Sequence, residues 1–341
     1  MISFLKQKTF LDFFPTPEFL LLSTAGVAIA DENIKFVQLR SEMMAGGLKL
    51  AHLSIVDLPP GTLESGLVNN PAEFTSALKK IAVHCHTRYV HAALPEEKAY
   101  LFTASIGRVP PEGLRDAVAF IIEENVPITL AESVFDFEII GETAHAHEIK
   151  LAVTVLPKNI VNTYIELFES AGITPISFDT ESQAIARAII RRGDKRTYLI
   201  VNLTLNKTGF YIVEEEVVQF STTSAYGIGQ DSSYPNFDDL RSEMRKVLTF
   251  WNTRTDLHHQ DSNEVSASKV SGKKVEKILL CGFGSGQEDF VEKLMEGSEV
   301  EYTLSNVWSN TSSTNSRIPE ISFKGSLEYA SAVGLALPRG R

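Results

Sequence analysis

The sequence lacks the features that mark secreted, disulfide-bonded and membrane-spanning proteins. Its two cysteines, Cys85 and Cys281, lie far apart in apolar runs and read as buried side chains rather than as a disulfide framework. The longest apolar run, from Phe19 to Ala30, is about half of the ~20 residues that a membrane helix needs. The N-terminus has no long apolar segment followed by a small-residue cleavage site. These absences predict a cytoplasmic protein that would meet a membrane only through another protein.

Positive charge is also scarce. The chain has 32 Lys and Arg against 43 Asp and Glu, which gives a net charge of −11. The phosphates of a nucleic acid would repel such a surface, so the sequence predicts no nucleic-acid partner. A length of 341 residues exceeds what one compact core holds, and therefore predicts at least two domains.

Recognisable catalytic and metal-binding motifs are missing. The glycines of "GFGSG" do not have the spacing of a dinucleotide fingerprint, and no histidine follows Ser285 to complete a hydrolase triad. His84 and His86 would share one face of a strand, but no third and fourth ligand follow at a recognisable spacing. We therefore predict no catalytic residue and no metal site, with zinc at the two histidines as the alternative.

Two kinds of segment are expected to lie outside the regular elements. Residues 1–18 form an aromatic arm that ends in prolines, and we expect it to pack on the first domain. A short helix on a membrane surface is the alternative for this arm. Residues 260–274 and 306–326 are polar and without period, and are expected to be irregular loops.

One pattern occurs twice in the chain, as an apolar strand, a polar turn and a second apolar strand. It is "AGVAIADENIKFVQL" at residues 25–39 and "YLIVNLTLNKTGFYIV" at residues 198–213. A duplicated strand-and-helix domain that faces its copy across a cleft is the plan of the actin-like ATPases. In that plan each hairpin carries an acidic residue that holds magnesium through water, and a glycine that lets backbone amides meet phosphate.

Beyond this repeat, the sequence resembles the PilM family of type IV pilus assembly proteins over nearly its whole length. The ordered segments that carry the resemblance, besides the two hairpins, are "FFPTPEFL", "LPPGTLESGLV", "LPEEKAYLFTASI", "GLRDAVAFIIEENVPITLAESVFDFEIIGE", "LAVTVLPKNIVNTYIELFESAGITPISFDTESQAIARAI", "RSEMRKVLTFW", "ILLCGFGSG" and "YASAVGLAL". The resemblance implies a scaffold of a type IV pilus or related secretion platform. It also implies that the N-terminal peptide of a PilN-like inner-membrane protein binds in a groove between the first domain and an inserted subdomain, and that other platform components are partners.

The fold class that follows is α/β, an actin-like ATPase (ribonuclease H-like) two-domain fold with an inserted subdomain of the FtsA and PilM type. The resemblance to FtsA implies that this subdomain suits self-association. The expected division is an N-terminal arm at 1–18, a first-domain core at 19–88 and 173–195, an inserted α/β subdomain at 89–172, and a second domain at 196–341.

Both hairpins depart from the family pattern. Ala28 and Asn202 stand where the two aspartates are usual, so neither hairpin brings a carboxylate to a magnesium ion. Thr204 replaces a glycine, and its Cβ crowds the close approach of backbone to phosphate. Because phosphoryl transfer depends on positioning and on metal ions that neutralise charge, we predict that ATP is not hydrolysed.

Four residues still match the family's nucleotide-binding positions. Gly282 and Gly284 fall in the loop expected on the adenosine side, and Lys35 and Thr208 agree with the two hairpin patterns. We expect no cofactor here, and weak ATP binding without turnover is the alternative. Two other hypotheses stay open, an active ATP-hydrolysing member of the superfamily and an FtsA-like filament protein that associates with membrane.

Overall fold

The computed structural model describes residues 25–42, 47–84, 87–143, 148–229, 237–260, 273–311 and 321–338. The expected aromatic arm at 1–18, Cys85 and His86 of the histidine pair, and residues 261–272 of the first polar loop lie outside the described residues. So do residues 312–320 of the second polar loop.

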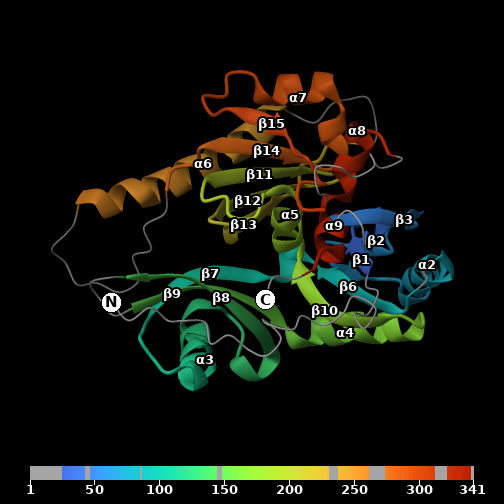
Figure 1. Ribbon diagram of the computed structural model, residues 1–341, viewed down its shortest axis with the longest axis horizontal. Helices are drawn as coiled ribbons and strands as arrows, with labels where there is room; N and C mark the ends of the chain where they lie inside the picture. The colour runs from blue at the N-terminus through green and yellow to red at the C-terminus, as the bar shows by residue number, and fades with distance from the viewer. Residues whose placement is uncertain are drawn as a thin grey trace.

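Two five-stranded sheets repeat the same order of strands (Figure 1). In each sheet, three antiparallel strands joined by hairpins are followed by two parallel ones. The first sheet, in spatial order, consists of β10 (Thr174–Thr180), β6 (Tyr89–Leu94), β1 (Ala25–Ile29), β2 (Asn33–Glu42) and β3 (Gly47–Asp57). The second consists of β13 (Val217–Ser224), β12 (Thr208–Glu214), β11 (Thr197–Leu203), β14 (Lys277–Cys281) and β15 (Tyr302–Leu304). The duplication predicted from the two hairpins is confirmed.

Helices cover both faces of each sheet, and two of them lie between the sheets (Figure 1). The outer face of the first sheet packs on α2 (Pro71–His84) and α4 (Lys158–Ser170). The outer face of the second packs on α6 (Phe237–Gln260) and α7 (Glu288–Met295). The buried helices α5 (Glu181–Ile189) and α9 (Ala330–Ala336) fill the space between the sheets. We call each sheet with its outer helices a half of the molecule.

Short elements complete the two halves. They are β4 (Leu63–Glu64), β5 (Leu67–Val68), η2 (Glu96–Lys98), η5 (Phe283–Gly286), α8 (Phe323–Ser326) and η6 (Leu327–Tyr329). The 3₁₀ turn η2 follows β6 directly, and η5 is the glycine loop predicted after the strand β14.

A third sheet with its own core is inserted into the first half. Its strands lie in the order β7 (Tyr100–Gly107), β9 (Glu148–Pro157) and β8 (Ser133–Thr143), and its remaining elements are α3 (Leu114–Asn125), η3 (Pro111–Gly113) and η4 (Leu130–Glu132). The expected bounds of this insertion, 89–172, are too wide. The strand β6 pairs with β1, and α4 buries Tyr164 and Phe168 in the core of the first half. We therefore propose residues 99–157 as the insertion.

Candidate functional site

The turns of the two repeated hairpins have the same construction. The amide of Ala30 donates to the carbonyl of Asn33 at 2.9 Å, and the amide of Thr204 donates to the carbonyl of Lys207 at 3.0 Å. The strand registers place Ala28 and Asn202 at the same distance from their turns. The two positions that would carry aspartates are therefore equivalent, as predicted from the sequence pattern.

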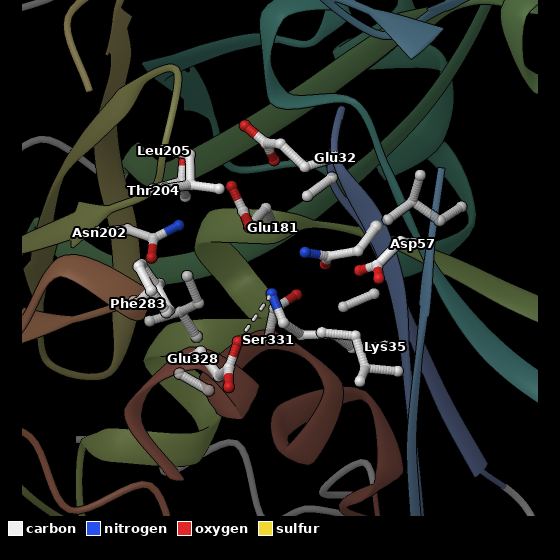
Figure 2. Close-up of a pocket in the computed structure, with 18 residues that line it drawn as sticks. Glu32, Lys35, Asp57, Glu181, Asn202, Thr204, Leu205, Phe283, Glu328 and Ser331 are labelled. Atoms are coloured by element: carbon white, nitrogen blue, oxygen red, sulfur yellow. Dashed lines mark ion pairs between the residues drawn. The ribbon is translucent and has the colours of Figure 1, made fainter. Parts of the chain in front are cut away.

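Both hairpins face one cavity of about 300 Å³ between the halves (Figure 2). The helix α5 and the loop η5 supply further walls. The lining residues are Ala28, Ile29, Ala30, Glu32, Asn33, Lys35, Ile55, Asp57, Glu181, Ile185, Asn202, Thr204, Leu205, Gly282, Phe283, Glu328, Ala330 and Ser331.

The charges in this cavity are mostly negative. Its acidic lining residues are Glu32, Asp57, Glu181 and Glu328, and its basic lining residue is Lys35. The Lys35 ammonium lies 3.6 Å from the Glu328 carboxylate and forms an ion pair with it, which Figure 2 draws as a dashed line. A polyanion such as a nucleoside triphosphate would meet net repulsion here.

Of the four residues predicted to contact a nucleotide, the structure brings Gly282 and Lys35 to the cavity. Gly282 has a φ of 87° and a Cβ there would lie 2.4 Å from the carbonyl oxygen of Leu203, so the fold itself requires glycine. Gly284 is buried, and a Cβ there would be 2.5 Å from the side chain of Ile228. Thr208 is fully buried and its hydroxyl donates to the carbonyl of Tyr226 at 2.8 Å. Gly284 and Thr208 do not line the cavity.

The structure adds one group that the sequence reasoning missed, an ion cluster around Lys207. This lysine, in the turn of the second hairpin, lies 3.7 Å from the carboxylate of Asp31 in the turn of the first. It also forms an ion pair with Glu97 of η2. Each of the three side chains is about one-sixth exposed, at 16%. Glu97 lies 110 residues before Lys207 in the chain, and Asp31 lies further away still. No local sequence pattern therefore predicts these contacts.

A second acidic residue of η2 holds the start of α5. Glu96 is buried, and its carboxylate accepts hydrogen bonds from the Ser182 amide at 3.0 Å and the Ser182 hydroxyl at 2.8 Å. Thr180 caps the same helix in a reciprocal capping box with Gln183. Burial raises the pKa of Glu96, and the hydrogen bonds from Ser182 oppose that shift.

The carboxyl group of Glu181 lines the cavity and interacts electrostatically with the ammonium group of Lys207. Burial raises the pKa of Glu181 to about 7, against the lowering effect of the Lys207 ammonium. Glu96 and Glu97 raise it further, while the hydroxyl of Tyr211 donates to its Oε2 at 3.1 Å. The carboxyl is therefore an acid that titrates close to neutral pH.

A separate groove of about 790 Å³ lies between the insertion and the first half. Its lining residues are Leu94, Arg115, Val134, Phe135, Asp136, Glu138, Thr154, Leu156, Val161, Ser177, Phe178, Asp179, Thr180, Gln183 and Arg187. They include residues of β8 and β10, and each of these strands is at the edge of its sheet. Arg187 of α5, which is one of these lining residues, donates to the Asp179 carboxylate at 2.8 Å and to the Gly334 carbonyl at 3.1 Å.

Among the residues that the structure describes, no group of three or more histidine, cysteine, aspartate or glutamate side chains is placed to hold a metal ion. None of the described helices is long and apolar enough to cross a membrane.

Comparisons with known proteins find the following similarities. A PilM–PilN type IV pilus biogenesis complex contains a chain 19% identical, with a TM-score of 0.70 over 92% of this chain and 98% of that one. The cytoplasmic domain of EpsL from the Vibrio cholerae type II secretion system is 9% identical, with a TM-score of 0.44 over 76% and 82% of the two chains. The ethanolamine utilization protein EutJ of Carboxydothermus hydrogenoformans is 12% identical, with a TM-score of 0.45 over 94% and 90%. No curated protein sequence matches the chain.

The fold is that of the actin-like ATPases, with an insertion in the first half. The sequence profile of the type IV pilus assembly protein PilM matches residues 26–233, which is more than half of the chain. The chain is a member of the PilM family of type IV pilus assembly proteins.

Proposed function

We propose that the protein is a cytoplasmic scaffold in the inner-membrane platform of a type IV pilus or a related secretion system. In this role it binds the N-terminal cytoplasmic peptide of a PilN-like membrane protein and is held at the membrane by that partner. The observation that carries the proposal is the groove beside the insertion, which is lined by two edge strands. A similar solved chain comes from a PilM–PilN complex.

An edge strand offers a peptide unpaired backbone groups along one side. The strand β8 ends the order β7–β9–β8, and β10 ends the order of the first sheet. A short extended peptide can add to either edge by main-chain hydrogen bonds, while side-chain pockets select its residues. Val134 is 41% exposed in the wall of this groove and offers an apolar contact. Asp136 and Glu138 follow it on β8 and favour a peptide that carries a basic residue.

The test is binding of a synthetic N-terminal peptide from the PilN-like protein encoded with this chain, measured by isothermal titration calorimetry. Val134→Arg places a charged side chain in the groove and is expected to weaken binding by about tenfold or more. Phe120→Arg is the matched control, because Phe120 is an exposed apolar residue of the same insertion that does not line the groove. Equal affinity for both variants and the unaltered protein would contradict the proposed site.

We also propose that the protein does not hydrolyse ATP. The residues present do not fit a magnesium-bound nucleotide, since Ala28 and Asn202 bring no carboxylate to the cavity. Lys35 is paired with Glu328, and Lys207 is paired with two carboxylates between the hairpin turns. Phe283, which is 47% exposed, lines the same cavity from the glycine loop.

Calorimetry with ATP and magnesium tests this second statement. We expect no heat of binding at micromolar concentrations and no phosphate release above that of the buffer. Micromolar, magnesium-dependent binding would instead support the active member of the superfamily. Self-association through the insertion stays a prediction, and sedimentation of the full chain over a range of concentrations tests it.

A further inference from the structure

Three ion pairs, around two lysines that come from opposite halves, join the halves of the molecule. Lys207 of the second half meets Asp31 and Glu97 of the first, and Lys35 of the first half meets Glu328 beside the glycine loop of the second. We propose that the Lys207 cluster is a built-in latch, in which the lysine ammonium holds the two halves closed where a bound ligand would otherwise do so. This goes beyond the scaffold role, and it does not depend on the peptide groove.

Lys207 and its partner Asp31 both lie in turns of the repeated hairpins. Asp31 lies in the turn between β1 and β2, and Lys207 lies in the turn between β11 and β12. These are the turns of the two repeated hairpins, one from each half, and the ion pair is a direct link between them at 3.7 Å. Because the side chains are only 16% exposed, water and salt screen this attraction less than that of a surface pair.

The charges around the lysine explain why its loss should open the cavity. Burial lowers the pKa of Lys207, but the carboxylates of Glu97, Glu181 and Asp31 outweigh it, and the net shift is upward. The ammonium thus remains charged at all physiological pH values. Without it, no cation of the second half attracts the carboxylates of Asp31 and Glu97, so the link between the two turns is lost. The two carboxylates would also be left close together in the first half, where burial and the charge of Glu97 raise the pKa of Asp31.

The latch is also connected to the insertion. Glu97 lies in η2, directly before β7, the first strand of the inserted sheet. Its neighbour Glu96 accepts hydrogen bonds from Ser182 at the start of α5, the helix that contributes Glu181 to the cavity and Arg187 to the groove. The same three-residue turn therefore anchors the latch, the central helix and the insertion.

The first experiment compares the full-length protein with Lys207→Met by small-angle X-ray scattering and by hydrogen–deuterium exchange. We expect a larger radius of gyration for the variant. We also expect exchange at least about threefold faster in the peptides that contain the two turns, because their local opening becomes easier. Lys277→Met is the matched control, since Lys277 pairs with Glu301 at 2.6 Å within the second half and does not cross the cavity. A variant with unchanged scattering and unchanged exchange in both turns would overturn the proposal.

A second variant keeps the proposal testable if Lys207→Met does not fold. Glu97→Gln removes one carboxylate and retains a side chain of the same shape. It is expected to speed exchange in the turn of the second hairpin, residues 203–208, which carries no substitution. The charge swap of Lys207→Glu with Glu97→Lys should restore exchange toward that of the unaltered protein, because an ion pair can form again with reversed polarity. If hydrogen exchange in the doubly substituted protein were as fast as in Lys207→Glu alone, the contact would not be what holds the two halves together.

Discussion

Gly334 of α9 lies directly against the backbone carbonyl of Ala184 in α5. A Cβ at Gly334 would be only 1.7 Å from that carbonyl oxygen. On the other side of the same helix, a Cβ at Gly26 of β1 would be 2.0 Å from the carbonyl oxygen of Ala332. The helix α9 is thus held between α5 and the first sheet by backbone contacts, and glycine is needed on both sides.

We predict that Gly334→Ala destabilises the protein by about 2–4 kcal/mol, because the added methyl group cannot be accommodated without shifting backbone. The measurement is urea-induced unfolding followed by circular dichroism. Gly107→Ala is the matched control, because a Cβ at Gly107 meets no atom within 4 Å. A loss of stability that is the same for both variants would show that the crossing of α5 and α9 tolerates the methyl group.

We predict that Glu96→Ala costs about 2–3 kcal/mol of stability. The substitution removes the acceptor for the amide and hydroxyl of Ser182, and leaves the buried amide without this partner and the hydroxyl with Thr180 Oγ1 at 3.0 Å. Chemical unfolding gives the difference, and Glu112→Ala, at an exposed residue of the insertion, is the control with an expected change near zero. If Glu96→Ala were as stable as the control, the carboxylate would not be the anchor of α5.

The sequence predicted the parts of this fold whose signals are local. Each hairpin shows its strands and polar turn within about 15 residues, so both could be located and aligned with each other. The same alignment found Ala28 and Asn202 at equivalent positions, and the registers of both hairpins agree with it. The helix α6 has a local signal of the same kind, because Leu240, Met244, Val247 and Trp251 recur at helical spacing and are buried.

The contacts between segments far apart in the chain could not be predicted. Nothing near Lys207 indicates that its partners are Asp31 and Glu97, since those contacts arise only when the two halves face each other. The bounds of the insertion were missed for a similar reason. The strand β6 and the helix α4 adjoin the insertion in sequence, but each buries its apolar face against the first half. Thr208 matched the family pattern, yet its hydroxyl is used for a buried backbone contact.

We predict that Arg187→Met lowers stability by about 1–2 kcal/mol, since the guanidinium donates to the Asp179 carboxylate and to the Gly334 carbonyl and thereby ties β10 to α9. Arg187→Lys should recover only part of this loss, because a lysine lacks the planar group that reaches both acceptors. Thermal unfolding measures the effect, with Arg191→Met at an exposed neighbouring position as the control. Full recovery by lysine would mean that charge alone accounts for the contact.

The buried carboxyl of Glu181 predicts a dependence of stability on pH. Its pKa is about 7 in the folded protein against 4.5 for an ordinary glutamate, so the folded state binds more protons than the unfolded state between these values. Stability from this group is therefore greatest at low pH and falls as the pH rises from 4.5 through 7, with no further loss above that.

Glu181→Gln removes this titration while leaving an oxygen that can accept the hydrogen bond from Tyr211. We expect the variant to gain stability relative to the unaltered protein as the pH rises from 5 to 8, by about 1–3 kcal/mol. Urea unfolding at several pH values measures the difference between the two proteins. The difference between the proteins is the relevant quantity, because Asp31 and Glu96 also have raised pKa values. Their titration makes stability fall with rising pH in both proteins alike, and it cancels in the difference. Stability curves that stay parallel across this range would show that Glu181 is ionised at neutral pH, as a third carboxylate around Lys207 beside those of Asp31 and Glu97.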